Sequence, residues 1–236
     1  MQIWQRFLRL LTSARIITTS MFSQFRSRAI SDNSVDKDIA GEATDSPGTA
    51  VDPFESLRKI KSRGPAPVHL WDPPFCGDMD MVIARDGTWI HEGQPIRRPA
   101  MVKLFASVLK LEDDGDYYLV TPVEKVRIQV QDCPFVALEM EVEGEGEGRQ
   151  QNLTFTTNAG EVVTAGAEHP IRIAVNPETA EPHPVVHVRS GLNALINRAV
   201  FYRLVDLMES HKTQSGQLLT GIYSDGEFFT FDALAG

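Results

Sequence analysis

The chain has 236 residues, of which 42% are apolar and 8% aromatic, enough for one large or two small globular domains. Its formal net charge of −9 argues against binding to a nucleic-acid backbone as its main activity. The two cysteines form no CxxC motif or disulfide framework, so we expect a reducing compartment and a cytoplasmic protein.

The first 52 residues differ in charge from the rest of the chain. Residues 1–30 contain five arginines and no acidic residue, whereas residues 31–52 contain six acidic residues and one lysine. The linker has too few large apolar side chains to form a core, so we interpret residues 1–52 as a disordered basic leader and an acidic linker. A membrane-surface helix, a targeting peptide and a true start at Met21 stay open for the leader. Membrane binding is expected only weakly, through residues 1–30.

Residues 53–148 are predicted to form an N-terminal α+β unit with a proline-rich strap. The Asp52-Pro53 pair has the pattern of a helix start. Four prolines between Pro65 and Pro74 predict an extended segment across an apolar surface. Alternating apolar residues and turn signals then predict, in order, a hairpin over 79–91, a helix opened by Pro99, and strands over 117–121, 123–131 and 135–143.

Residues 149–236 are predicted to form a C-terminal α+β unit. Its longest helix is expected over 191–211, with Ser190 as the N-cap, because apolar residues cover most of the circumference of a helix built from this stretch. The remaining alternating patterns predict strands over 152–157, 161–164, 170–175 and 185–189 and a closing hairpin over 218–231.

The two units show signs of internal duplication. A hairpin–helix–hairpin order runs from Gly77 to Gln131, and a second pass of the same order runs from Gln151 to Phe231. The clearest echo is Gln94-Pro95-Ile96-Arg97 against His169-Pro170-Ile171-Arg172. We therefore predict an α+β fold of two duplicated strand-rich units, each with one main helix.

The chain carries no recognised catalytic motif, so a non-catalytic binding or regulatory protein is the leading interpretation and an enzymatic activity stays open. Basic residues near the ends of predicted elements could meet at the junction of the units and bind a nucleotide or another phosphate-bearing molecule. Aromatic residues could stack on a base, and an acidic residue could orient a lysine or a hydroxyl. The candidate site comprises Trp71, Trp89, Arg97, Glu124, Lys125, Arg172, His187, Arg189 and Tyr202. The structural alternative is that each arginine pairs with a nearby carboxylate.

Two other functions compete with ligand binding. One is an enzyme that uses Asp78, Asp80 and His187 in the same cleft. The other is a protein-interaction module that presents a strand edge or an apolar patch and takes no small molecule. Because His183 and His187 lack a fixed ligand spacing with other residues, no metal site is predicted, and the cofactor stays unknown.

Several motifs together resemble an uncharacterised bacterial family, domain of unknown function 1285. They are Gly64 to Gly77, Asp80, Arg85-Asp86-Gly87-Thr88-Trp89, Val120 to Val126, His169-Pro170-Ile171-Arg172 and Phe201 to Val205. The resemblance covers about residues 56–232. It implies a duplicated α+β core, a C-terminal half similar to pleckstrin-homology-like folds, a nucleotide-type ligand at the domain interface and a role in signalling.

Overall fold

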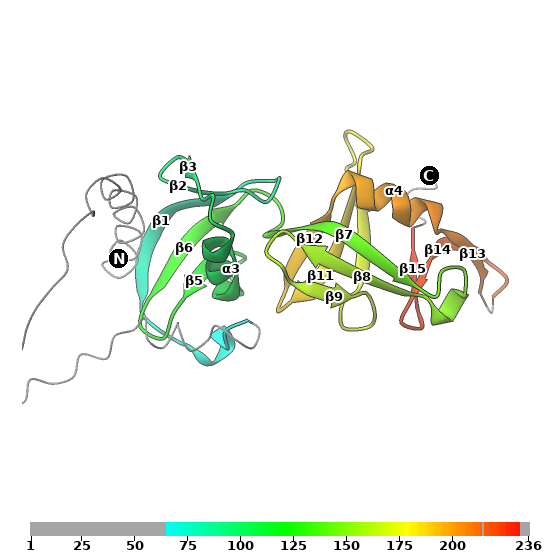
Figure 1. Cartoon of the computed structure of the whole chain (residues 1–236), viewed down its shortest axis with the longest axis horizontal. Helices are drawn as coiled ribbons and strands as arrows, with labels where there is room; N and C mark the ends of the chain where they lie inside the picture. The colour runs from blue at the N-terminus through cyan, green and yellow to red at the C-terminus, as the bar shows by residue number, and fades with distance from the viewer. Residues whose placement is uncertain (1–64, 214, 232–236) are drawn as a thin grey trace, which may run out of the picture. The chain divides into compact units, whose positions relative to one another are not determined.

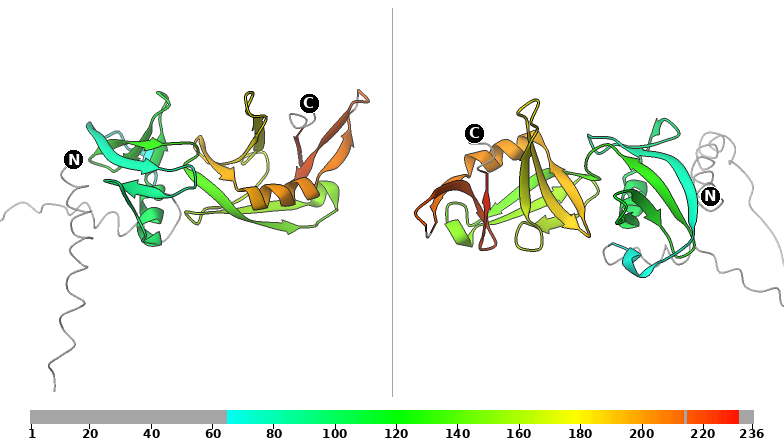
Figure 2. Two further views of the ribbon diagram at one scale, coloured as in Figure 1. Left: turned by 90° about the horizontal axis from the view of Figure 1, so that it is seen from above. Right: turned by 180° about the vertical axis from the view of Figure 1, so that it is seen from behind.

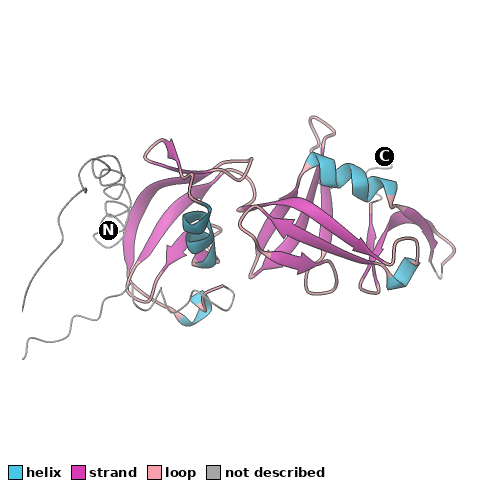
Figure 3. Cartoon of the chain, viewed as in Figure 1, coloured by secondary structure: helices cyan, strands magenta, loops and turns pink. Residues whose placement is uncertain are grey.

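The computed structural model describes residues 65–213 and 215–231, in which a first strand-rich half is followed along the chain by a second (Figure 1). The basic leader, the acidic linker and the predicted helix start at Asp52-Pro53 lie outside these residues. The described part is mostly β-structure with two short α-helices, α3 and α4, which refines the predicted α+β class (Figure 3).

The first half of the described chain contains six strands, one α-helix and a short 3-10 helix. In order, these elements are η1 (Val68–Leu70), β1 (Phe75–Ile83), β2 (Trp89–His91), β3 (Gln94–Pro95), α3 (Pro99–Ser107), β4 (Leu109–Leu111), β5 (Tyr117–Val120) and β6 (Lys125–Val130). The second half continues with β7 (Phe135–Glu143), η2 (Gly148–Gln150), β8 (Asn152–Thr157), β9 (Val162–Thr164), β10 (Ile171–Val175), β11 (Pro182–Arg189), β12 (Leu192–Ile196), α4 (Arg198–Asp206), β13 (Glu209–Lys212), β14 (Leu218–Ser224) and β15 (Glu227–Thr230).

The first sheet has the strand order β3-β2-β1-β6-β5-β4. Its two central strands, β1 and β6, are parallel, and every other pair is antiparallel. The alternation along β6 sets which face of the strand is buried: Val126 and Ile128 point into the core, and Lys125 and Arg127 are partly exposed on the other face. The predicted strands over 117–121 and 123–131 are thereby confirmed.

The second sheet repeats this plan with strands β7 to β12. Its order is β9-β8-β7-β12-β11-β10, again with a parallel central pair, β7 and β12, and antiparallel neighbours. Each sheet therefore consists of two three-strand meanders. The first strand of the first meander pairs with the last strand of the second meander at the centre of the sheet. The predicted duplication is confirmed, although the second copy begins at β7 rather than at Gln151.

The two similar motifs at residues 94–97 and 169–172 do not occupy equivalent positions in this repeat. Residues 94–97 include β3, the third strand of the first sheet, whereas residues 169–172 lead into β10, the fourth strand of the second sheet. Arg97 and Arg172 consequently occupy non-equivalent places in the repeat. The first sheet ends at Val130 and the second begins at Phe135, and the division predicted after residue 148 lies in the connection between β7 and β8.

The long helix predicted over 191–211 is wrong. Ser190 and Gly191 both have positive φ, 45° and 78°, and form the two-residue turn that joins β11 to β12. Along β12, alternate residues are buried, and this period of two fits a strand. The helix α4 begins only after Asn197, whose Oδ1 accepts a hydrogen bond from the Val200 backbone N–H at 2.8 Å. An apolar stretch that contains both periods looked like one helix.

One helix packs against each of the two large sheets. In the first, Phe105 of α3 is fully buried and stacks on Trp89 with ring centroids 6.0 Å apart. In the second, α4 lies alongside β7 and buries Val200, Phe201 and Leu204 (Figure 2). The prediction of one main helix per unit is confirmed for the described residues.

A third, smaller sheet of β13, β14 and β15 attaches to the second sheet through a buried serine. Ser224 Oγ accepts a hydrogen bond from the Leu153 N–H at 2.9 Å and donates to the Ala165 carbonyl at 2.7 Å. Within the ranges that the structure describes, no helix is long and apolar enough to cross a membrane. The pleckstrin-homology-like comparison stays a prediction.

Candidate functional site

A polar groove of about 490 Å³ lies over the two central strands of the first sheet and the turn between β4 and β5. It is lined by Asp78, Met79, Gly115, Asp116, Tyr117, Arg127, Ile128, Gln129, Val130 and Gln131. Arg127 and Gln129 of this lining are alternate residues of β6, and Gln131 follows in the same alternation, so these side chains project to one face of the sheet. The groove is therefore a direct product of strand geometry.

Arg127 is the only basic residue in this lining, and two carboxylates hold it. Its Nε and Nη2 donate to the two Asp78 oxygens at 2.7 and 3.1 Å, and its Nη1 donates to Asp116 Oδ2 at 2.9 Å. Asp78 and Arg127 face each other because they are partners in the β1–β6 register. The Arg127 guanidinium lowers the pKa of Asp78, and the two carboxylates raise the pKa of Arg127.

Further charge pairs continue from the groove along the same side of the first sheet. Lys125 Nζ donates to Glu112 Oε2 at 2.8 Å and lies 4.9 Å from the centre of the Tyr118 ring. The Tyr118 hydroxyl donates to Asp114 Oδ2 at 2.7 Å, and this bond raises the pKa of Tyr118 to about 12. Acidic and basic groups thus alternate, and each cation here already has a carboxylate partner.

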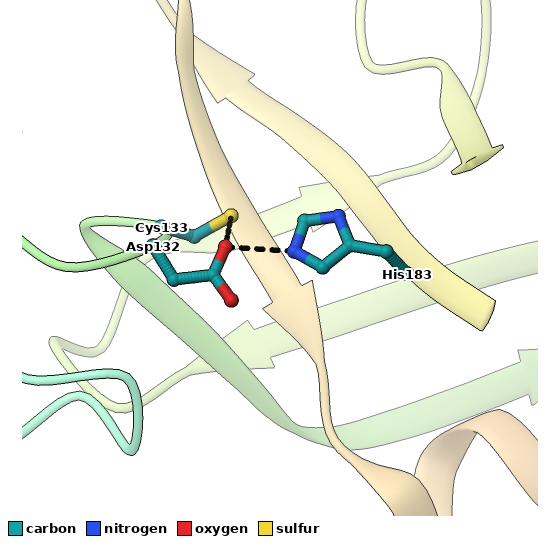
Figure 4. Close-up of side chains that lie close together, drawn as sticks. All are labelled: Asp132, Cys133 and His183. Atoms are coloured by element: carbon teal, nitrogen blue, oxygen red, sulfur yellow. Dashed lines mark hydrogen bonds and ion pairs between the residues drawn. The ribbon is translucent and has the colours of Figure 1, made fainter. Parts of the chain in front are cut away.

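A second cluster follows directly after Gln131, in the connection between β6 and β7 (Figure 4). Asp132 Oδ1 accepts a hydrogen bond from His183 Nε2 at 2.7 Å and lies 3.5 Å from Cys133 Sγ. Asp132 Oδ2 pairs with Arg85 Nε at 3.1 Å. Because Arg85 follows β1 and His183 lies on β11, Asp132 ties the first sheet to the second.

Burial raises the pKa of the Cys133 thiol to about 12, and the neighbouring Asp132 carboxylate adds to this effect. Burial also raises the pKa of Tyr117, with smaller contributions from Cys133 and Asp132, so the phenol that lines the groove lies near the cluster. A raised pKa lowers the thiolate fraction of Cys133 and with it the reactivity of the sulfur as a nucleophile.

Two of the basic residues predicted to bind phosphate have carboxylate partners. Lys125 pairs with Glu112, as described above. The Arg189 guanidinium is largely buried, pairs with Glu161 Oε1 at 3.4 Å and donates to the backbone carbonyls of Ala106 at 2.6 Å and Leu109 at 3.4 Å. Burial lowers the pKa of Arg189. Both residues therefore form the ion pairs with nearby carboxylates that were the alternative to phosphate binding.

The other basic and histidine positions lie apart along the chain. Arg97 and Arg172 are exposed, and neither forms an ion pair with another described residue. His187 connects the segment before β10 to the turn between β11 and β12. Its Nδ1 bonds to the Glu168 carbonyl at 2.9 Å, and its Nε2 accepts a hydrogen bond from the Gly191 N–H at 3.2 Å. Its ring also stacks on His169. His187 is thus separate from the Asp78 of the alternative catalytic set, which pairs with Arg127.

The predicted stacking residues are also placed differently from one another. Trp89 is 1% exposed and belongs to the core, whereas Trp71 is half-buried at the end of η1. Tyr202 is exposed on α4 and accepts a hydrogen bond from Arg198 Nε at 2.7 Å. Glu124 is half-buried, with its backbone N–H bonded to the Thr121 hydroxyl. None of the nine predicted site residues lines the groove.

The sequence pattern contained a signal for the groove that the prediction did not use. Arg127 and Gln129 alternate with buried residues along the strand predicted over 123–131, so their side chains project from the outer face, and Asp116 lies immediately before β5. Their convergence depends on Asp78, 49 residues before Arg127, reaching it across a parallel strand pair. That pairing is a property of the sheet order and not of any local motif.

Residues 66–133 match the family model "Domain of unknown function (DUF1285), N-terminal domain", and residues 134–231 match the C-terminal domain of the same family. The chain belongs to the DUF1285 family. The two matched segments meet between Cys133 and Pro134, in the connection that joins the first sheet to the second.

Two solved structures of DUF1285 proteins resemble the chain. The protein from Silicibacter pomeroyi DSS-3 is 55% identical, with a TM-score of 0.67, over 80% of this chain and 100% of that one. The protein from Shewanella baltica OS155 is 27% identical, with a TM-score of 0.43, over 56% of this chain and 94% of that one. The search of curated proteins found no match.

Proposed function

We propose that this DUF1285 protein is a non-catalytic binding protein with a regulatory role, and that the groove over β1, β5 and β6 takes its ligand. The observation that carries the proposal is the position of Arg127, with its guanidinium held by Asp78 and Asp116 in a groove of about 490 Å³. A volume of this size suits a small molecule. The two free cysteines support a cytoplasmic location.

The chemistry of the lining suggests the class of ligand. The Arg127 side chain is 43% exposed, so an anionic group can approach its guanidinium and replace one of the carboxylates. The planar fork of arginine suits phosphate or carboxylate oxygens. The displaced carboxylate would then accept hydrogen bonds from ligand hydroxyls. A nucleotide-type ligand supplies both groups, with its phosphate at Arg127, its ribose hydroxyls at Asp116 and its base near Tyr117.

The charge balance of the groove limits this class. Two aspartates and one arginine give the lining a net negative charge, and the whole chain is acidic. A multiply charged phosphate would therefore be repelled, whereas a ligand with one negative charge and several hydroxyl or amine groups fits the available donors and acceptors. Cyclic nucleotides, whose phosphodiester carries one negative charge, belong to the favoured group, whereas nucleoside monophosphates, with a charge of about −1.5 to −2 at pH 7, do not.

A thermal-shift screen of the full chain against nucleoside monophosphates, cyclic nucleotides and inorganic phosphate tests the proposal. A ligand at 100 times its dissociation constant adds about 2.7 kcal/mol, which raises Tm by several degrees. We expect the shift to disappear in Arg127→Gln and to persist in Arg97→Gln and Arg172→Gln. A shift that persists in Arg127→Gln and is lost in the other two would move the ligand to the residues predicted from the sequence.

A protein-interaction module is the second candidate function, because α4 leaves apolar side chains exposed. Tyr202 is 53% exposed and Val205 is 37% exposed, and their spacing of three residues places them on one side of the helix. If no small molecule raises Tm and groove variants behave like the parent chain, this candidate is favoured. The next variant to examine is then Tyr202→Ser combined with Val205→Ser.

A further inference from the structure

Three side chains outside the groove bring nitrogen, sulfur and oxygen donors together. The Asp132, Cys133 and His183 ligand atoms all lie within 4.8 Å of one another (Figure 4). Figure 4 shows the three groups converging from two segments that lie about fifty residues apart in the sequence. Such a mixed set is typical of a transition-metal site rather than of a solvated acidic surface.

The backbone holds each donor firmly. Asp132 and Cys133 lie in the connection from β6 to β7, and both β6 and β7 are central strands of their sheets. His183 lies in β11, paired with Ala174 of β10 and flanked by Pro182 and Pro184. Proline restricts the backbone on both sides of the histidine, so holding the His183 backbone in place costs little additional conformational entropy. The site is therefore arranged by the fold itself.

A neighbouring group orients the carboxylate. Arg85 Nε binds Asp132 Oδ2 at 3.1 Å, whereas Oδ1 faces both His183 Nε2 and Cys133 Sγ. One oxygen is thus fixed by a neighbour, and the other is directed at the two remaining donors. Outer partners commonly orient metal-binding carboxylates in this way.

We propose that Asp132, Cys133 and His183 form a zinc-binding site that links the connection between the two sheets to β11. Zinc binds histidine nitrogen, cysteine sulfur and carboxylate oxygen at about 2.0–2.3 Å, so tetrahedral ligands lie roughly 3.3–3.8 Å apart. The Cys133–Asp132 separation of 3.5 Å already falls in this range. The His183–Asp132 separation of 2.7 Å is a hydrogen bond that opens by about half an ångström when zinc replaces its proton.

The donor set decides which metal is bound. Magnesium and calcium take oxygen ligands, so a cysteine and a histidine exclude them as the natural occupants. Zinc accepts all three donors, and a water molecule completes four-coordination. On binding, the Cys133 thiol loses its proton to solvent and its sulfur bonds to zinc as thiolate. Arg85 pairs with Asp132 at the same site, and its positive charge weakens the affinity relative to a site without it.

The burial of the three side chains is consistent with entry of an ion. Cys133 is 7% exposed, whereas the side chains of Asp132 and His183 are 15% and 33% exposed. Solvent therefore reaches the site from the His183 side while the thiol stays covered. The site is separate from Arg127, and the zinc proposal does not depend on the ligand proposed for the groove.

The test is a zinc titration of the full chain, stripped with a chelator and kept reduced, in competition with a chromophoric chelator. We expect one zinc per chain, and loss of that equivalent in Cys133→Ser and in His183→Gln. Cys76→Ser and His69→Gln are matched controls, because each removes the same residue type outside the cluster, and both should still bind one zinc. Circular dichroism establishes that each variant is folded.

Cobalt gives a second readout that does not depend on stability. Cobalt bound with Cys133 as a ligand produces a thiolate-to-metal charge-transfer band in the near ultraviolet, and this band should vanish in folded Cys133→Ser but persist in Cys76→Ser. The proposal is overturned if the parent chain binds less than one equivalent. It is also overturned if the Cys133 and His183 variants bind as much metal as their controls.

Discussion

The Arg189 guanidinium, on β11 of the second sheet, donates to the backbone carbonyl of Ala106 in α3 at 2.6 Å. It also bonds to the Leu109 carbonyl and to Glu161, and it lies 5.8 Å from the centre of the Phe135 ring. One arginine therefore satisfies acceptors from both halves of the chain. Its role in this structure is to join them.

Arg189→Met should lower the free energy of unfolding by about 3 kcal/mol, because it leaves a partly buried carboxylate without its ion-pair partner and removes one donor from each of two backbone carbonyls. Urea denaturation followed by circular dichroism measures the change. Arg172→Met, at an exposed position, should change stability by less than about 0.5 kcal/mol. Equal effects of the two substitutions would contradict the joining role.

Ser224→Ala should destabilise the chain by roughly 1–3 kcal/mol, since it removes a side chain that bonds the Leu153 N–H and the Ala165 carbonyl in a fully buried setting. The same denaturation experiment tests this, with the exposed Ser210→Ala as the control. A neutral result would mean that water reaches these backbone groups.

The Asp78–Arg127 pair should respond to acid. Because Arg127 lowers the folded-state pKa of Asp78 below its ordinary value of 3.8, the pair stabilises the fold above that value, and the contribution is lost as the pH falls through the folded-state pKa. In Arg127→Gln we expect the pKa of Asp78 to return toward 3.8. A carboxyl NMR titration measures this. The pKa of Asp86 is lowered by bonds from Thr88, so it should not move and serves as the internal control.

Cys133 should react slowly with alkylating reagents. Its pKa of about 12 leaves very little thiolate at pH 8, and the thiol is 7% exposed. Mass spectrometry of the metal-free chain after timed iodoacetamide treatment should show Cys76 modified well before Cys133. Both should react at similar rates in denaturant. Early modification of Cys133 in the folded chain would show that its surroundings are open.

Local sequence patterns predicted most of the strands but not how they are ordered. Alternation identified β6 and β7, and alternation with turn signals identified the first hairpin over 79–91, because these features depend on neighbouring residues alone. The stretch 191–211 was misread because Leu192, Ala194 and Ile196 fit a strand in the second sheet as well as an apolar helix. Only the partner strands, β7 and β11, decide between the two.

The candidate sites depend on contacts between residues that are distant in the sequence. Asp78 reaches Arg127 through a parallel pairing, and Asp132 reaches His183 across the connection between sheets. Neither pair has a local motif. The sequence prediction relied instead on the likeness of residues 94–97 to residues 169–172, which occupy non-equivalent places in the repeat. Asp132 and Cys133 were not singled out, because adjacent acidic and cysteine residues have no meaning until His183 is known to lie beside them.

The parallel pairing at the centre of each sheet also sets an order in which the chain can acquire its structure on the ribosome. Phe75 pairs with Lys125, and Phe135 pairs with Ala194. In both sheets, therefore, the strand that is synthesised first has no parallel partner until the last strand of that sheet has been synthesised. The first sheet can close once Val130 has emerged, before most of the second has been synthesised. In the second sheet β7 waits for about sixty residues of synthesis, compared with about fifty for β1 in the first, so the first strand of each sheet has an edge without its parallel partner during that interval.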